Sequence, residues 1–388
     1  MHVFISAGEP SGDLHGANLI RALRTQHPGI RITGFGGDKM EAAGADLLFK
    51  LTSLAVMWVG KVLSSLRTFI GLARQAVDHW EKDRPDLVVF IDYPGFNFAL
   101  AKRAHALGIP VYFFVPPQLW AWASWRVKKV RRWFTGVLTA LPFEDEWYRN
   151  RGVATHYIGH PYFDDLSRTQ FDAAFIAEQR KKRGPIIALL PGSRNAEVAN
   201  NFENMLRAAK LIHAALPDVR FLVASFNEEQ AAAARAIESA SGLPIEIHSG
   251  HTQEIIALAH SCIAVSGSVS LELMSRLKPA IIMYRDRSPI GGLLKWLVFH
   301  LLVKVKYITL VNLLAGEELY PEFATLRDSS GAMADQIVRW LKHPTEMAER
   351  VERLRKVRDV VAVPGACDRA ASFLLASVQN PDAARTAA

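Results

Sequence analysis

The chain has 388 residues, of which 50% are hydrophobic and 22% charged, which is typical of a globular protein with enough apolar residues for two domain cores. Its formal net charge of +8 favours an anionic partner, such as a phosphorylated substrate or a lipid surface. The two cysteines, Cys262 and Cys367, have neither metal-site nor CxxC spacing, which argues against a disulfide scaffold, a zinc site and a thiol enzyme. No apolar run is long enough to predict a membrane-spanning helix.

The first half of the chain alternates short β-rich runs with amphipathic stretches. In chain order, strands are predicted at His2–Ala7, Arg31–Gly36, Pro85–Asp92, Pro110–Val115, Gly136–Leu141 and Thr155–Ile158, with helices at Gly16–Gln26 and Phe96–Leu107. The run PDLVVFID at Pro85–Asp92 is apolar throughout, as buried parallel strands are. Strands that alternate with helices predict βαβ units and a parallel sheet.

A polar, charged segment at Asp165–Gly184 is interpreted as a linker, after which the alternation restarts. Strands are predicted at Gly184–Leu190, Val219–Ala224, Ile245–His248, Cys262–Val265 and Ala280–Tyr284, with a long helix at Ala196–Leu216. The fold class is therefore α/β, with two Rossmann-like, doubly wound parallel-sheet domains, at 1–165 and 184–343, that face a central cleft. Helices at about 345–380 are expected to return to and complete the first domain.

Two carboxylates follow predicted strands in the first domain. Glu9 lies in the turn after His2–Ala7, and Asp92 closes Pro85–Asp92. A carboxylate at the end of an apolar strand is costly unless it is exposed or paired, so each is a candidate for chemistry, with Asp92 as a general base. The alternatives are an ordinary strand-to-helix turn with Asp13 as helix cap, and a helix-capping role for Asp92.

In the second domain, two Gly-Ser turns follow predicted strands. Pro191–Arg194 (PGSR) and Ser266–Ser268 (SGS) each precede a helix, and backbone N–H groups, hydroxyls and an arginine suit a diphosphate. Each loop alone is also consistent with a plain turn, but two at one sheet edge favour a nucleotide diphosphate. Tyr284, Arg285 and Asn312 are candidate ligands because of their positions at or near strand ends.

The stretch RVKKVRRWF after the loop PPQLWAW is interpreted as a solvated basic face with an apolar stripe, and no nucleic-acid partner is expected. The stretch Leu54–Leu72 places apolar residues near helical spacing with basic residues between them. It suits either an interfacial membrane helix or a helix that faces the core.

Taken together, these pieces resemble the lipid A disaccharide synthases, a glycosyltransferase family of the GT-B type. The matching pieces are AGEPSGD at 7–13, LAVMWVGKVL at 54–63, PDLVVFIDYPGFN at 85–97, PPQLWAW at 116–122, LPFE at 141–144, IGHP at 158–161, LLPGSRNAEV at 189–198, SGSVSLE at 266–272 and YITLVNLLAG at 307–316. The sequence departs from the family at Gly95, where the family often has a second aspartate.

The resemblance implies transfer of 2,3-diacylglucosamine from UDP-2,3-diacylglucosamine to the 6-hydroxyl of 2,3-diacylglucosamine 1-phosphate (lipid X), with inversion and without a metal or cofactor. It also implies a cytoplasmic enzyme on the inner-leaflet membrane surface, and it leaves open a homodimer with exchange of the C-terminus. Glu272 resembles the acidic residue that binds the nucleotide ribose in related enzymes. The candidate site residues are Asp92 and Glu9 for catalysis; Gly192, Ser193, Arg194, Ser266, Gly267, Ser268, Glu272, Tyr284 and Arg285 for UDP; Ser11, Asn97 and Asn312 for other substrate contacts; and Val56, Trp58, Val62, Leu66 and Phe69 for the membrane.

Two other functions stay open at this point. One is another UDP-sugar enzyme of the same fold, such as a lipid glycosyltransferase or a UDP-GlcNAc 2-epimerase. The other is a nucleotide-sugar or lipid-binding protein without turnover, against which Asp92 and Arg194 argue. The acceptor separates these possibilities, because only the lipid A reaction needs two acylated sugars.

Overall fold

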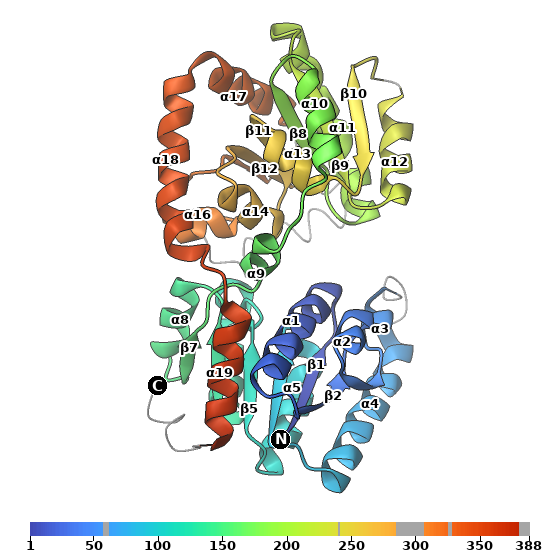
Figure 1. Ribbon diagram of the computed structural model, residues 1–388, viewed down its shortest axis with the longest axis vertical. Helices are drawn as coiled ribbons and strands as arrows, with labels where there is room; N and C mark the ends of the chain where they lie inside the picture. The colour runs from blue at the N-terminus through green and yellow to red at the C-terminus, as the bar shows by residue number, and fades with distance from the viewer. Residues whose placement is uncertain (57–61, 240, 285–305, 325–327, 380–388) are drawn as a thin grey trace. The chain divides into compact units, whose positions relative to one another are not determined.

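The protein divides into two compact units, each built on a parallel sheet (Figure 1). The computed structural model describes residues 1–56, 62–239, 241–284, 306–324 and 328–379. Unit 1 contains Met1–Ser167 and Val361–Ala388, and unit 2 contains Arg168–Val360. Two parallel-sheet α/β domains confirm the predicted fold class.

The described part of unit 1 forms a seven-stranded sheet in the order β3-β2-β1-β4-β5-β6-β7, and every pair of neighbours is parallel. Its strands are β1 (His2–Ala7), β2 (Arg31–Phe35), β3 (Asp46–Phe49), β4 (Leu87–Ile91), β5 (Val111–Phe114), β6 (Gly136–Thr139) and β7 (Thr155–Tyr157). Strand β1 has the predicted bounds. The sequence analysis missed β3, whose four residues lie at the sheet edge and are only partly buried, so they lack the apolar run that marks a central strand.

The helices of unit 1 cover both faces of this sheet, and their inward residues form two apolar cores, one on each face. They are α1 (Pro10–Gln26), α2 (Asp38–Ala42), α3 (Thr52–Val56), α4 (Val62–Lys82), α5 (Pro94–Ala106), α6 (Leu119–Trp122), the 3-10 helix η1 (Ser124–Arg126), α7 (Val127–Trp133), α8 (Pro142–Arg149), α9 (Tyr162–Ser167) and α19 (Ala366–Gln379). Asp13 is part of α1 and does not cap it; its carboxylate accepts hydrogen bonds from the N–H groups of Gly37, Lys39 and Met40, at the start of α2.

The last described helix, α19, returns to the beginning of the chain and lies beside α1 (Figure 1). The carboxylate of Asp164 accepts hydrogen bonds from the N–H groups of Gly365, Ala366 and Cys367, and so caps α19. The sequence analysis placed the return at about residue 345, whereas the structure keeps α18 (Pro344–Val361), apart from its last residue, in unit 2.

Unit 2 repeats the arrangement with a six-stranded sheet of described residues, in the order β10-β9-β8-β11-β12-β13, again with all neighbours parallel. Its strands are β8 (Ile186–Leu190), β9 (Arg220–Ser225), β10 (Ile245–Ser249), β11 (Ser261–Val265), β12 (Ala280–Tyr284) and β13 (Glu322–Ala324). Its helices are α10 (Ala173–Lys181), α11 (Asn195–Ala215), α12 (Glu228–Glu238), α13 (Thr252–Leu258), α14 (Val269–Ser275), α16 (Leu310–Ala315), α17 (Ser330–Lys342) and α18. The sequence analysis missed β13, which has three residues at the sheet edge.

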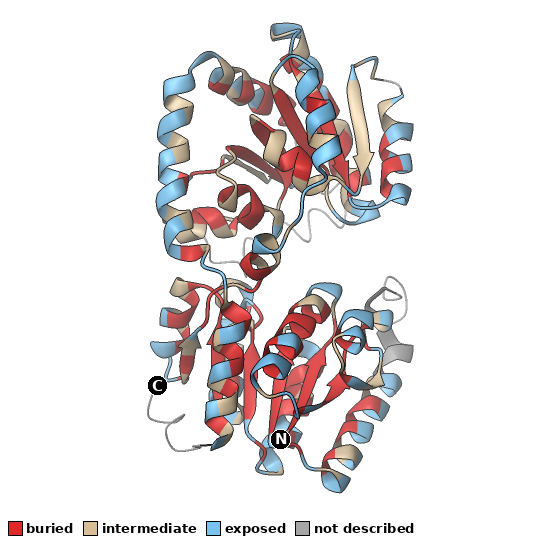
Figure 2. Cartoon of the chain, in the orientation of Figure 1, coloured by how far each residue is buried: buried red, intermediate tan, exposed pale blue. Residues whose placement is uncertain are grey.

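The central strands are buried along their length, whereas most helices are buried on one side only (Figure 2). This is the pattern expected when helices cover both faces of a parallel sheet. By length and composition alone, the stretch Pro344–Gln379 could cross a membrane. It is divided between α18 and α19, and α19 buries Cys367, Ala370 and Leu374 in the core of unit 1, as a core helix does.

Candidate active site

The candidate catalytic residues of unit 1 lie where the strand order of its sheet reverses. From β1 the chain continues to β2 on one side, and from β4 it continues to β5 on the other. Doubly wound sheets bind ligands at the carboxyl ends of the strands that flank such a point. Because Ala7 pairs with Ile91 across β1 and β4, the carboxylates of Glu9 and Asp92 follow these strands at the same edge. The structure therefore brings together the two residues that the sequence analysis selected for catalysis.

The backbone at Asp92 has a rare conformation. Asp92 and Tyr93 have φ angles of 42° and 48°, and Val115, which follows the neighbouring strand β5, has a φ of 51°. Left-handed conformations cost about 1–2 kcal/mol for a residue with a side chain, and they gather at functional sites where the surroundings hold them. Two adjacent strand ends thus leave the sheet through strained turns, one of which carries the candidate base.

Asn97 on α5 holds the turn at Asp92 from inside the protein. Its fully buried side chain donates to the carbonyl oxygens of Asp92 at 2.8 Å and Ile91 at 3.2 Å, and it accepts from the hydroxyl of Ser6 at 2.8 Å. The sequence analysis selected Asn97 as a substrate contact. In the structure the polar atoms of this side chain are used within the fold and hold the backbone of Asp92, and the substrate contact stays a prediction.

The ring of Tyr93 lies against Gly8, at the end of β1. A Cβ atom at Gly8 would clash with the ring, so only glycine fits there. Burial, and after it the charge of Glu9, raises the pKa of the Tyr93 phenol. Tyr93 therefore packs between the two strand ends that carry the candidate carboxylates.

Burial, and after it the charge of Glu9, raises the pKa of the Asp92 carboxyl to about 6, although a hydrogen bond from the Tyr93 N–H lowers it. A carboxylate of raised pKa is a stronger base, yet above pH 6 it is still ionised and able to accept a proton. This matches the requirement for a general base that works near neutral pH.

Replacing Glu9 with glutamine is expected to move the acidic limb of the kcat/KM profile below pH 6, because removal of a neighbouring negative charge favours ionised Asp92. The position of the limb is the readout, since its height also responds to any substrate contact of Glu9. Glu146→Gln, an exposed change on α8, is the matched control and leaves the limb in place. An unmoved limb in Glu9→Gln would contradict the proposed coupling.

A buried polar cluster that the sequence analysis did not select lies at the carboxyl ends of β5 and β6. The carboxyl of Glu144 accepts from the indole N–H of Trp120 and from the N–H of Ala140, both at 3.2 Å. Burial raises the pKa of Glu144 to about 8, so this group is largely protonated at neutral pH. Tyr148 is also fully buried, and its hydroxyl donates to the carbonyl of Pro117 at 3.4 Å. The motifs PPQLWAW and LPFE thus meet in one hydrogen-bond network beside the strand ends. In the sequence, the one sign of this network is an acidic residue, Glu144, within an otherwise apolar motif.

The two Gly-Ser turns of unit 2 also follow neighbouring strands at a reversal of strand order. From β8 the chain continues to β9 on one side, and from β11 it continues to β12 on the other. Pairing of Leu190 with Ala264 across β8 and β11 places the turns Pro191–Arg194 and Ser266–Ser268 at the same sheet edge. The structure therefore places the expected diphosphate loops as neighbours.

In this structure the first of these loops holds a carboxylate of the protein itself. Glu197, in the first turn of α11, accepts hydrogen bonds from the N–H groups of Ser193 at 2.9 Å and Arg194 at 3.3 Å, and from the Arg194 guanidinium at 2.8 Å. Gly192 has a φ of 117°, and a Cβ there would clash with the Glu197 side chain. The groups expected to bind an anion thus already bind one, and the sequence analysis missed Glu197 although it lies in the same motif.

Asn312, another expected substrate contact, is also hydrogen-bonded within the fold. Its fully buried side chain donates to the Tyr320 carbonyl at 2.7 Å and the Glu322 carboxylate at 2.8 Å, and accepts from the N–H groups of Leu319 at 2.9 Å and Tyr320 at 2.8 Å. Glu322 in turn accepts from the N–H groups of Ile308 and Thr309, both at 2.8 Å. Asn312 therefore joins the two ends of the segment 308–322, and its contact with a substrate stays a prediction.

The remaining described candidates for UDP lie at or near the same edge of unit 2. Ser266 and Tyr284 line a shallow pocket at the carboxyl ends of β11 and β12, together with Glu322 at the start of β13. Glu272 is buried in α14 and forms an ion pair with Arg276 at 3.0 Å. Arg285 lies outside the described residues. In unit 1, Ser11 is exposed in the first turn of α1.

The residues expected to face a membrane fall mostly outside what the structure describes. This holds for Trp58 and for the side chains of Val56, Val62 and Leu66. Phe69 is described, and its ring packs on the rings of Tyr93 and Phe96, with centroids 6.2 and 5.4 Å apart. For Phe69 this packing suits the core-facing alternative, and the membrane contact of the stretch stays a prediction.

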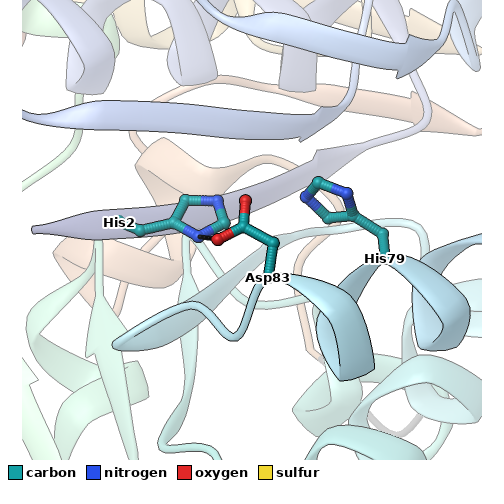
Figure 3. Close-up of side chains that lie close together, drawn as sticks. All are labelled: His2, His79 and Asp83. Atoms are coloured by element: carbon teal, nitrogen blue, oxygen red, sulfur yellow. Dashed lines mark ion pairs between the residues drawn. The ribbon is translucent and has the colours of Figure 1, made fainter.

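A cluster of possible metal ligands lies at the amino ends of the unit 1 strands, opposite the candidate catalytic residues (Figure 3). His2 on β1, His79 on α4 and Asp83 just after α4 bring their ligand atoms within 4.8 Å of one another. Arg31 already lies among them: its guanidinium contacts Nδ1 of His2 at 2.9 Å and pairs with Asp83. Because a guanidinium disfavours a second cation there, this cluster is an ion-pair network that joins β1, β2 and α4.

Comparisons with known proteins agree over nearly the whole chain. The family model described as lipid-A-disaccharide synthetase matches residues 3–375. The chain is 33% identical over 382 residues to a lipid-A-disaccharide synthase of Syntrophus aciditrophicus, with 98% of each chain covered. It is 34% identical over 362 residues to one of Methylobacillus flagellatus, which covers 92% of this chain and 94% of that one.

Solved structures share the fold at low sequence identity. A UDP-GlcNAc 2-epimerase from Neisseria meningitidis bound to UDP-GlcNAc superimposes with a TM-score of 0.62 at 13% identity, over 96% of this chain and 98% of that one. The calicheamicin glycosyltransferase superimposes with a TM-score of 0.61 at 15% identity, over 98% of both chains. At these identities the likeness shows the fold alone.

Proposed function

The chain belongs to the lipid-A-disaccharide synthetase family, and from this premise we infer that it transfers 2,3-diacylglucosamine from UDP-2,3-diacylglucosamine to the 6-hydroxyl of 2,3-diacylglucosamine 1-phosphate. The products are the β-1,6 disaccharide 1-phosphate and UDP. The observation that carries this inference is the family match over residues 3–375, which spans both units. The epimerases among the structural neighbours share only the fold, so they do not favour a second function.

Asp92 is the proposed base of the reaction. As the acceptor 6-oxygen attacks C1 of the donor sugar, its proton moves to the Asp92 carboxylate, and the bond between C1 and the diphosphate oxygen breaks to release UDP. Support comes from the raised pKa of Asp92, its position at the reversal of strand order and its fixed turn. The charge of Glu9 contributes to the raised pKa of Asp92, and Glu9 is the second proposed catalytic carboxylate.

The turn Pro191–Arg194 is the proposed site of the donor diphosphate, with Ser266–Ser268 beside it. The N–H groups of Ser193 and Arg194 and the Arg194 guanidinium would exchange the Glu197 carboxylate for diphosphate oxygens. A cation and backbone donors stabilise the charge that develops on the leaving group. On this account the transfer needs no metal ion.

Glu197→Gln is expected to tighten the binding of UDP by about 3–10-fold, because a neutral side chain competes less well for Arg194 than a carboxylate does. Isothermal titration calorimetry with UDP gives the Kd. A thermal melt of the same variant measures any loss of stability that comes from weaker capping of α11. Glu203→Gln removes the ion pair with Arg207 on the same helix and is the matched control, with an unchanged Kd. Weaker UDP binding in Glu197→Gln would show instead that Glu197 orients Arg194 for the ligand.

The function is tested by following UDP release with and without the acylated acceptor, in the presence of EDTA. A disaccharide synthase releases UDP only when both acylated sugars are present. Release of UDP from the donor alone, or epimerisation of UDP-GlcNAc, would contradict the inferred function and favour another UDP-sugar enzyme. Loss of activity in EDTA that Mg²⁺ restores would overturn the metal-independent mechanism.

We also propose that the protein works in the cytoplasm at the inner-leaflet membrane surface, since both substrates carry acyl chains. A homodimer with an exchanged C-terminus stays a prediction. In the structure α19 packs on α1 of the same chain.

A further inference from the structure

Most of the net positive charge of this protein comes from one stretch of its sequence. Between Asp92 and Glu144 there is no acidic residue, whereas seven lysines and arginines occur there. The stretch 93–143 therefore carries a formal charge of +7, while the whole chain carries +8. The remainder of the chain carries a formal charge of +1, so the acidic residues that balance basic ones elsewhere are missing from this part of unit 1.

The fold gathers most of these charges on one side of a short helical stretch. The 3-10 helix η1 leads directly into α7, and together they span residues 124–133. Val130 is fully buried and Val127 packs on the same core. The outer side carries exposed residues at i, i+3 and i+7 spacing, namely Trp125, Lys128 and Arg132.

We define the basic–aromatic surface by six exposed residues of α6, η1 and α7. These are Trp122, Trp125, Lys128, Lys129, Arg131 and Arg132. Trp125 is 57% exposed and Trp122 38% exposed, which is unusual for the largest apolar side chain. Among the residues that the structure describes, none forms an ion pair with any of the four cations of this surface.

We propose that the basic–aromatic surface docks on an anionic phospholipid bilayer. Tryptophan is enriched at membrane interfaces, where its apolar ring and its N–H group are both satisfied. Lysines and arginines that form no ion pair with the described residues are attracted to anionic headgroups. The surface is distinct from the stretch Leu54–Leu72 that the sequence analysis selected for membrane contact. The proposal rests on the proposed function in one respect: acylated substrates give the protein a reason to bind a membrane.

A single-stranded nucleic acid is the other anionic partner that tryptophans and basic residues could bind. One contact argues against it. The Arg126 guanidinium lies over the Trp122 ring, 5.1 Å from its centroid, and so covers one of the two faces on which a base could stack. Insertion at a bilayer interface needs no free ring face, so the observations favour the membrane.

Flotation of the full-length protein with vesicles tests the proposal, using phosphatidylcholine vesicles with and without about a third of phosphatidylglycerol. Lys128→Gln/Arg132→Gln is expected to weaken binding to the anionic vesicles by roughly 25-fold, about fivefold for each cation removed. Trp125→Ser is expected to weaken binding to both kinds of vesicle. Lys181→Gln/Arg183→Gln, which removes two exposed cations from unit 2, is the matched control and retains wild-type binding.

Equal losses in the control, or none in the α7 variant, would overturn the proposal, as would tighter binding of a single-stranded oligonucleotide than of anionic vesicles at the same salt concentration. UDP release with detergent-dispersed substrates is measured in parallel and is expected to be unchanged in every variant. Wild type that binds vesicles as expected but releases no UDP would refute the proposed function and leave the docking surface intact. Normal turnover, with vesicle binding unchanged in Lys128→Gln/Arg132→Gln, would refute the docking surface and leave the proposed function intact.

Discussion

Replacing Asp92 with asparagine is expected to lower kcat/KM by about 10²–10⁴-fold, because the amide cannot accept the proton of the acceptor hydroxyl. The change is nearly isosteric and leaves the strained turn in place, since Asn97 holds the carbonyl oxygen of residue 92 and not its side chain. Asparagine also tolerates the left-handed conformation that Asp92 adopts. The loss should therefore appear in turnover, with thermal stability and UDP affinity close to those of wild type.

The pH dependence of the same variant separates base catalysis from a structural effect. In the wild type the rate should fall as pH drops through about 6, where Asp92 becomes protonated. Asp92→Asn has no carboxyl to titrate, so its residual rate should lack this limb. Undiminished turnover would discard Asp92 as the base and leave Glu9 as the next candidate.

Asn312→Ala is expected to lower the free energy of unfolding of unit 2 by about 2–4 kcal/mol, because it leaves two buried N–H groups and the Tyr320 carbonyl without this partner and removes one of the donors to the Glu322 carboxylate. The amide makes two hydrogen bonds as donor and two as acceptor, all within the segment 308–322. Asn312→Asp should be at least as damaging, since it sets a carboxylate against the Glu322 carboxylate and the Tyr320 carbonyl.

Urea unfolding of the full-length chain, followed by circular dichroism, measures this loss. Asn195→Ala, which removes an exposed amide that bonds to Glu229, is the matched control and should change stability by less than about 0.5 kcal/mol. A variant at Asn312 with wild-type stability and a raised KM would support the substrate contact that the sequence analysis expected.

Much of the fold follows from local sequence patterns. The continuous apolar runs predicted the central strands, and β1 and β12 have the predicted end residues. The edge strands β3 and β13 escaped prediction because a short, partly exposed strand has no apolar run to mark it. The return of the chain to unit 1 was placed too early, because α18 is helical like α19 and only packing decides to which unit each belongs.

The site was predictable in its backbone placement but less so in its side chains. Carboxyl ends of neighbouring parallel strands share one edge, which is why Glu9 and Asp92 could be paired from the sequence. The inward direction of Asn97 and Asn312 could not, because it depends on partners distant in the chain or on the path of a loop. The pairing of Glu197 with Arg194 had a local signal, a glutamate three residues after the helix cap, which is the spacing of a capping box.

Analysis of the product tests the central claim most directly. The enzyme is incubated with UDP-2,3-diacylglucosamine and 2,3-diacylglucosamine 1-phosphate, UDP is quantified, and the linkage of the lipid product is determined by NMR. The account predicts one UDP for each disaccharide, joined from C1 to the 6-oxygen in the β configuration. UDP without disaccharide would mean hydrolysis, and an α linkage would contradict a single displacement assisted by Asp92.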